Sequence, residues 1–291
     1  MSSVHATTLK RRRKVSAGRA ARYAALLLLA LIFAFPFYWM FVTSVEPAAR
    51  LGDVPPNVLP LWDWGNYADA WNAVANPGWP RYFGNTVFIA SATTVLAVVT
   101  ALPAAYALAL LRFPGKRLFF LVILMVLVIP DEVILIPQYQ VLGWLGWLDT
   151  YQAQIVPFGA SALGIFLLRQ VFLGLPGELW DAAQLDGCSR TTYLVRVATP
   201  LAGPALVAVA LYTFLGSWNQ FLYPLIVTTT PDVQPLQVGL ATFLGVPHNT
   251  QYGQLAAASA FTILPIFVIF FAAQRTIIEG VSAAGGGALK G

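Results

Sequence analysis

Two adjacent carboxylates, Asp131 and Glu132, follow Pro130 inside a long apolar stretch of the chain. A charge at bilayer depth costs about 2.5 kcal/mol or more on insertion scales, and it usually faces a cavity or a partner. In a water-filled path, either carboxylate could accept hydrogen bonds from the hydroxyl groups of a solute. Alternatively, one of them bonds to backbone groups freed by Pro130 or to a partner subunit. A proton relay is disfavoured, because no intramembrane lysine or histidine accompanies the pair.

An indole, an amide and a phenol lie close together in a second apolar stretch, as Trp218, Asn219 and Tyr223. An indole face can pack on the apolar face of a sugar ring, and an amide can bond to its hydroxyl groups. Trp218 and Tyr223 would then line a path near its outer end. The same side chains could instead lock one helix to its neighbours. Packing is the favoured interpretation, and both stay open.

The side chains that most enzymes need are scarce. The chain contains two histidines, His5 and His248, and one cysteine, Cys188. They supply neither a Ser-His dyad nor an H-E-x-x-H metal site, and they exclude an internal disulfide. The C-terminal glycines and Lys290 lack the G-K-[S/T] ending of a phosphate-binding loop and have no following helix. We therefore expect no catalytic residue, no metal and no cofactor bound by this chain.

Composition places these polar residues in a membrane. Hydrophobic residues make up 58% of the 291 residues and charged residues 10%, with a mean hydropathy of +0.70. A spanning helix needs roughly 20 mostly apolar residues, whereas a barrel shows short alternating segments. Continuous runs therefore predict an all-α polytopic membrane protein with six transmembrane helices. The runs are 23–45, 86–111, 118–139, 151–172, 205–227 and 254–276.

Lysine and arginine, which favour the cytoplasmic side of a membrane, set the expected orientation. They gather before the first run, between the second and third runs, around 169–196 and after the sixth run, whereas only Arg50 and Arg81 fall on the other side. Both termini are therefore expected in the cytoplasm, with the chain in the cell (inner) membrane. The basic run at 10–14 directly precedes a span, so it predicts a topology anchor at anionic lipid rather than a nucleic-acid site. The expected divisions are a cytoplasmic tail (1–22), a first spanning helix (23–45), an external loop (46–85), a five-helix core (86–276) containing a cytoplasmic loop (174–204), and a cytoplasmic tail (277–291).

A polar, charged segment at 178–204 separates the fourth and fifth apolar runs. Pro176 and Gly177 end the preceding run, and Glu178 and Asp181 lie where carboxylates favour a helix N-terminus. Gly187 occupies the position of a left-handed residue after a helix end. The segment therefore predicts a short helix, a turn and a second short helix. A partner in water can hold such a helix in a groove.

The residues DAAQLDG at 181–187, followed by Pro200 and Pro204, resemble the EAA loop of binding-protein-dependent ABC importer permeases. The resemblance implies a type I permease fold in which this loop is a coupling helix, inserted into a cleft of a separate cytoplasmic ATPase. The family usually has Glu at the position of Asp181, so the side chain of this chain is one methylene shorter. The residues to which the resemblance assigns ATPase coupling are Asp181, Ala182, Ala183, Asp186 and Gly187.

Further stretches resemble the carbohydrate group of that family, in particular the second membrane subunit of maltose-type systems. They are YFGNT at 82–86, SWNQFL at 217–222 and ALKG at 288–291. The resemblance implies import of a carbohydrate (oligosaccharide, disaccharide, polyol or glycerol phosphate) by alternating access. It also implies a second permease subunit, two ATPase copies that bind ATP and Mg, and an external solute-binding protein. The alternatives are an ion-gradient-driven secondary transporter and an importer permease for a non-sugar solute.

Overall fold

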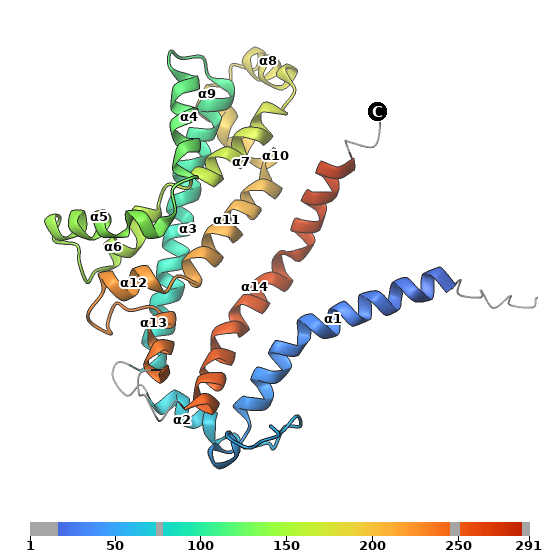
Figure 1. Ribbon diagram of the computed structural model, residues 1–291. Coiled ribbons are helices and arrows are strands. Elements are labelled where there is room, and N and C mark those ends of the chain that lie inside the picture. Colours follow the sequence, from blue (N-terminus) through green and yellow to red (C-terminus); the bar gives the residue numbers. More distant parts are fainter. Residues whose placement is uncertain (1–16, 74–77, 245–250, 287–291) are drawn as a thin grey trace, which may run out of the picture.

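The computed structural model describes residues 17–73, 78–244 and 251–286. Within these ranges the elements are helices, with no β-strand. The basic run at 10–14, both histidines and Lys290 lie outside the described residues. Figure 1 shows a bundle with α8 (Gly177–Leu185) at one end and α2 (Gly65–Ala73) at the other, and we call these the α8 end and the α2 end.

Several helices have the length and composition to cross a membrane. In the described ranges, four segments meet this criterion on their own: Ala21–Ser44, Trp79–Leu110, Tyr151–Leu173 and Tyr252–Ala272. Two bent helix pairs raise the number to six if each pair counts as one span. The prediction of an all-α polytopic membrane protein is therefore confirmed.

The centre of the bundle is α3 (Trp79–Leu110), which packs against α7 (Ala162–Leu173) and α11 (Gly203–Trp218). Fully buried alanines recur along α3 at positions 90, 97, 101 and 105. Small side chains let helix backbones approach closely in a membrane protein. The backbones of α7 and α11 also approach closely, because a Cβ added to Gly164 would lie 2.9 Å from the Val209 side chain.

The first and last helices form a separate layer. α1 (Ala17–Ser44) packs against α14 (Tyr252–Gly286), and Figure 1 shows α1 turning away from the other helices toward its N-terminus. Only 6% of its most apolar window is buried within the chain. Such an apolar helix needs lipid or another helix around it.

The prediction of one continuous helix at 118–139 is wrong. α4 (Lys116–Val126) and α5 (Asp131–Trp144) are separate helices bent by 100°. Pro130 has an extended backbone, with ψ 138°, and its carbonyl accepts the N–H of Val133 at 3.1 Å to begin α5. Proline lacks an N–H and disfavours a helical residue before it, so α4 ends and a new helix starts. Asp131 and Glu132 are therefore in the first turn of α5, not within a straight span.

The expected continuous helix at 205–227 is likewise divided. α11 ends at Trp218, and α12 (Leu222–Val227) follows after a short break. Asn219 follows the last residue of α11, and its side-chain Nδ2 donates to the carbonyl of Leu215 at 2.9 Å, beside the normal helical bond from its own backbone N–H at 3.0 Å. A side chain that bonds to the preceding turn competes with helix continuation. The elements before α11 are α9 (Arg190–Tyr193), a π-helix (Leu194–Ala198) and α10 (Thr199–Leu201), which meet α11 at a bend of 81°.

At the α2 end, a loop at 228–235 joins α12 to α13 (Leu236–Ala241), and side chains from neighbouring elements hold it. Asn85, Tyr151 and Gln154 donate hydrogen bonds to its backbone carbonyls. Asp149 Oδ1 accepts the backbone N–H groups of Thr229 and Thr230 at 2.8 and 2.9 Å. Burial alone would raise the pKa of Asp149. The hydrogen bonds from Thr229 and Thr230 together lower it by more than burial raises it, so the pKa of Asp149 lies below its ordinary value.

Candidate functional site

The helix at the α8 end begins and is held in place through a few side chains. Pro176 precedes its first turn in an extended conformation, and Glu178 lies in that turn, near the positive end of the helix dipole. Ala183, 9% exposed, packs into the core that lies between α3, α7 and α9, and Leu179 and Trp180 pack against the same core. A helix of nine residues is marginal in water on its own, so this packing stabilises it.

The C-terminus of α8 has the geometry that the sequence predicts. Gly187 has φ 74°, and its N–H donates to the carbonyl of Gln184 at 3.0 Å. The N–H of Cys188 donates to the carbonyl of Ala183 at 2.9 Å. These two bonds form a Schellman motif, in which a left-handed residue after the helix satisfies its last carbonyls. The expectation of a left-handed residue at Gly187 is confirmed.

The chain then folds back onto α8. Ser189 Oγ accepts the N–H of Thr192 at 3.2 Å and so caps α9. The Arg190 guanidinium lies over the Trp180 ring, 4.7 Å from its centroid, and the Tyr193 ring meets the same indole edge to face at 5.1 Å. These contacts fasten α9 to the side of α8.

One face of α8 is exposed along its whole length. Glu178, Asp181, Ala182 and Leu185 lie at helical spacings of three and four residues, and all of them are exposed. Leu185 is 90% exposed, although leucine is among the residues most often buried. We call these four residues the outward stripe. Asp186 and Gly187, which continue beyond it, are exposed as well.

The residues to which the sequence assigned ATPase coupling fall into an exposed group and a buried one. Asp181, Ala182, Asp186 and Gly187 are accessible to a partner, whereas Ala183 faces the core. Sequence reasoning missed Leu185 and Trp180. The signal for Leu185 was its spacing from Asp181 and Ala182, which puts all three on one helix face.

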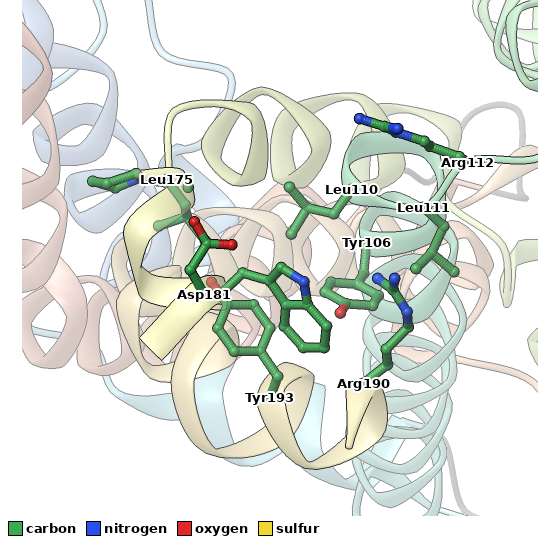
Figure 2. Close-up of a pocket in the computed structure, with 11 residues that line it drawn as sticks. Tyr106, Leu110, Leu111, Arg112, Leu175, Asp181, Arg190 and Tyr193 are labelled. Atoms are coloured by element: carbon green, nitrogen blue, oxygen red, sulfur yellow. The ribbon is translucent and has the colours of Figure 1, made fainter. Parts of the chain in front are cut away.

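A cavity of about 570 Å³ opens beside α8. Figure 2 shows Asp181 at one side of it and Arg112 and Arg190 at the other, with Tyr106 and Tyr193 between them. The cavity is bounded by the end of α3, the turn before α8, α8 itself and α9. Its lining residues are Tyr106, Leu110, Leu111, Arg112, Leu175, Pro176, Gly177, Trp180, Asp181, Arg190 and Tyr193.

The aromatic residues considered for a solute path are packed into the protein. Trp218 is 1% exposed and stacks on Phe214 at 5.5 Å. Tyr223 is 5% exposed, and its hydroxyl donates to the carbonyl of Ala153 at 2.9 Å. The two rings belong to different core clusters. In this conformation their geometry agrees with the packing interpretation.

The polar candidates for the path are exposed instead. Asp131 and Glu132 begin α5, which Figure 1 shows projecting sideways from the bundle, and Asn219 ends α11. Asp131 and Glu132 lie on a different helix from Asn219, and these three residues do not form one polar cluster with Trp218 and Tyr223. Among the residues that the structure describes, no group of three or more His, Cys, Asp and Glu side chains could hold a metal ion.

Comparison with known proteins identifies the family. A family model described as "Binding-protein-dependent transport system inner membrane component" matches residues 97–282, from the middle of α3 through α8 to α14. The arabinooligosaccharides transport system permease protein AraQ of Halalkalibacterium halodurans is 40% identical over 204 residues, which cover 70% of this chain and 73% of that protein. The diacetylchitobiose uptake system permease protein NgcG of Streptomyces coelicolor is 33% identical over 266 residues, which cover 90% and 87%.

A solved structure supports the fold. One chain in the crystal structure of a bacterial ABC transporter involved in the import of the acidic polysaccharide alginate has a TM-score of 0.78 to this chain. The match covers 92% of this chain and 99% of that one, at 23% identity. Since the family model spans more than half of the sequence, this chain belongs to the family of inner membrane components of binding-protein-dependent transport systems.

Proposed function

We propose that this chain forms the solute path of an ATP-driven carbohydrate importer and that α8 is its coupling helix. The observation that carries the coupling role is the outward stripe of α8, a small exposed surface on a helix that packs firmly into the bundle. A helix with that arrangement can dock in a groove of a partner and transmit a displacement to α3 and α7. The chain itself does no bond chemistry, since its family is the membrane component and the ATPase is a separate subunit.

The carbohydrate assignment rests on the relatives, which are named for arabinooligosaccharides and diacetylchitobiose. Oligosaccharides, disaccharides, polyols and glycerol phosphate are the solute classes that we propose. The importer would contain a second permease subunit, two copies of an ATPase that binds ATP and Mg, and an external solute-binding protein. An ion-gradient-driven transporter is not favoured, because the family depends on a binding protein.

Alternating access would follow from movement at the α8 end. Closure of the ATPase pair on ATP would displace α8 and open the central site outward, and hydrolysis would return it inward. Within this scheme Asp181, Ala182, Asp186 and Gly187 contact the ATPase, and Ala183 holds α8 to the core. For Asp131, Glu132, Trp218, Asn219 and Tyr223, contact with the solute would require a second conformation.

The test is uptake by the assembled importer in proteoliposomes. Binding protein loaded with arabino-oligosaccharide, diacetylchitobiose or glycerol 3-phosphate is added outside, and ATP hydrolysis and uptake are measured together. We expect one of these ligands to stimulate both, and Asp181→Lys to abolish the stimulation. Asp53→Lys, an equal charge reversal at an exposed loop position, is the control and should leave it intact. If Asp181→Lys kept the same ligand-stimulated ATP hydrolysis and uptake as Asp53→Lys, the coupling role of α8 would be refuted.

The orientation can be tested with a natural probe. We propose that both termini and α8 lie in the cytoplasm, as the distribution of lysine and arginine predicts. Cys188 is the single cysteine of the chain and lies three residues after Leu185, the last residue of α8. A membrane-impermeant thiol reagent should label it in inside-out vesicles and leave it unlabelled in right-side-out vesicles. The reverse pattern would invert the proposed topology.

A further inference from the structure

The cavity beside α8 has the size of a small-molecule site. Its volume of about 570 Å³ lies within the range of roughly 300 to 1,000 Å³ that is usual for ligand pockets. Its inner wall contains the nearly buried rings of Tyr106 and Tyr193, which are 5% and 1% exposed. Its outer wall contains the exposed Arg112 and Arg190. A ligand would therefore rest on an aromatic floor between two cations.

Arg190 is positioned to bind an anion in the cavity. Its guanidinium carbon lies over the Trp180 ring, 4.7 Å from the ring centroid, which is a cation–π arrangement. A guanidinium in this position has N–H groups that can make paired hydrogen bonds to phosphate or carboxylate oxygens. Arg112 approaches the same cavity from the chain segment that follows α3 (Figure 2).

The surrounding backbone also favours negative charge. Pro176 and Gly177 line the cavity at the N-terminus of α8, where the helix dipole is positive. The C-terminus of α3 would oppose an anion, but Lys116 Nζ donates to the carbonyls of Ala109 and Leu111 at 2.8 and 3.0 Å and offsets that effect. Among the described residues that line the cavity, Asp181 is the one carboxylate, against two arginines.

We propose that this cavity binds a phosphate-bearing anion, held by Arg112 and Arg190 on the Trp180 face. The phosphate can come from an anionic lipid headgroup, because the cavity lies at the end of α3, a helix long and apolar enough to cross a membrane, and basic pockets near the ends of such helices bind lipid headgroups. It can also come from a free phosphorylated solute. A bound phosphate would connect the segment after α3 to α8 and α9, and so influence how freely α8 moves. The binding itself does not depend on the proposed transport function.

The test uses the full-length chain in nanodiscs and has two arms. In neutral phosphatidylcholine, inorganic phosphate and glycerol 3-phosphate are titrated by calorimetry. In nanodiscs that contain phosphatidylglycerol, retained anionic lipids are counted by native mass spectrometry. Saturable binding in the first arm identifies a free phosphate compound as the ligand, and a retained lipid in the second identifies a headgroup. Either result supports the site if the variants below agree.

Arg190→Gln and Arg112→Gln should each weaken binding about 10- to 100-fold, the range for loss of a charged hydrogen-bonding group. Arg196→Gln is the matched control, because Arg196 is exposed in the same polar segment but does not line the cavity. Asp181→Asn should tighten binding, since it removes the carboxylate. Arg112→Gln also guards against misfolding of the Arg190 variant, because Arg112 lies outside the stack on Trp180.

Three outcomes would overturn the proposal. The first is no saturable binding in either arm, and the second is equal weakening by Arg196→Gln, which would indicate unspecific attraction. The third is that the pocket variants lower affinity for the ATPase subunit while phosphate fails to bind the assembled complex, because the cavity would then be a protein contact. Failure of ATP-driven uptake with phosphate binding intact would refute the transport proposal alone.

Discussion

Replacing Gly187 by alanine tests whether the end of α8 must keep its shape for coupling. Gly187 has φ 74°, and no atom lies within 4 Å of the position that a Cβ would take. The cost is therefore conformational and not steric. A left-handed conformation costs a residue other than glycine roughly 1–2 kcal/mol. If the chain relaxed instead, the two hydrogen bonds of the Schellman motif would be lost, at about 0.5–1.5 kcal/mol each.

The two estimates agree on the size of the effect. A penalty of one or two kcal/mol lowers the ratio of ordered to frayed helix ends by a factor of about 5 to 30. Amide hydrogen exchange at Cys188, whose N–H closes the motif, should therefore speed up in Gly187→Ala by a similar factor. Uptake per ATP hydrolysed should fall in the same variant. Gly187→Asn should be milder, because asparagine tolerates the left-handed conformation.

Gly203→Ala is the matched control. Gly203 belongs to the same polar segment, has open space at its Cβ position and has no left-handed φ, so alanine should leave both exchange and coupling unchanged. If the amide of Cys188 exchanged at the same rate in Gly187→Ala as in the wild type, the structural argument would be refuted. Faster exchange with full coupling would show that the ATPase does not need an ordered α8 end.

Three further predictions concern other parts of the chain. The ionised Asp149 contributes stability that is fully present above its unfolded pKa of about 3.9 and is lost as the pH falls through its lower folded pKa. Asp149→Asn keeps an acceptor oxygen but does not titrate, so the melting temperature of this variant should fall less than that of the wild type below about pH 4. Leu185→Ala should weaken affinity for the ATPase about 10- to 100-fold, the equivalent of roughly 1.5–3 kcal/mol for burying a leucine, whereas Val195→Ala, also at an exposed position, should not. Gly253→Ala would bring a Cβ within 2.6 Å of Asn66 Nδ2, so it should lower the unfolding free energy by about 1–3 kcal/mol, and unchanged thermal stability would contradict the close packing of α14 on α2.

Hydropathy located the spans but not the breaks in them, and the prolines explain why. Pro36, Pro103 and Pro265 lie inside continuous helices, whereas Pro130 separates two helices at an angle of 100°. Membrane helices tolerate proline where neighbouring groups satisfy the freed backbone. Whether they do depends on tertiary packing. A single sequence therefore could not distinguish Pro130 from the others.

The segment around α8 was more predictable because its signals are local. The first-turn carboxylate Glu178 and the left-handed Gly187 depend on backbone geometry that neighbouring residues determine, and the structure has both features. The exposure of Leu185 and the stack of Arg190 on Trp180 depend instead on how α9 folds back. Such contacts join residues through tertiary structure and leave no periodic pattern in the sequence.

The aromatic contacts at the α8 end bear on how a displacement of α8 could reach the membrane. Trp180 meets Tyr193 at 5.1 Å, and Tyr193 meets Tyr106 of α3 at 6.3 Å. Tyr106 in turn packs edge to face on Phe172 of α7 at 6.1 Å. Because each of these rings contacts the next, a displacement of α8 that moves Trp180 must either move Tyr193, Tyr106 and Phe172 or break those contacts. The short helix would then act as a rigid extension of α3 and α7, and the side chain that decides this is Trp180.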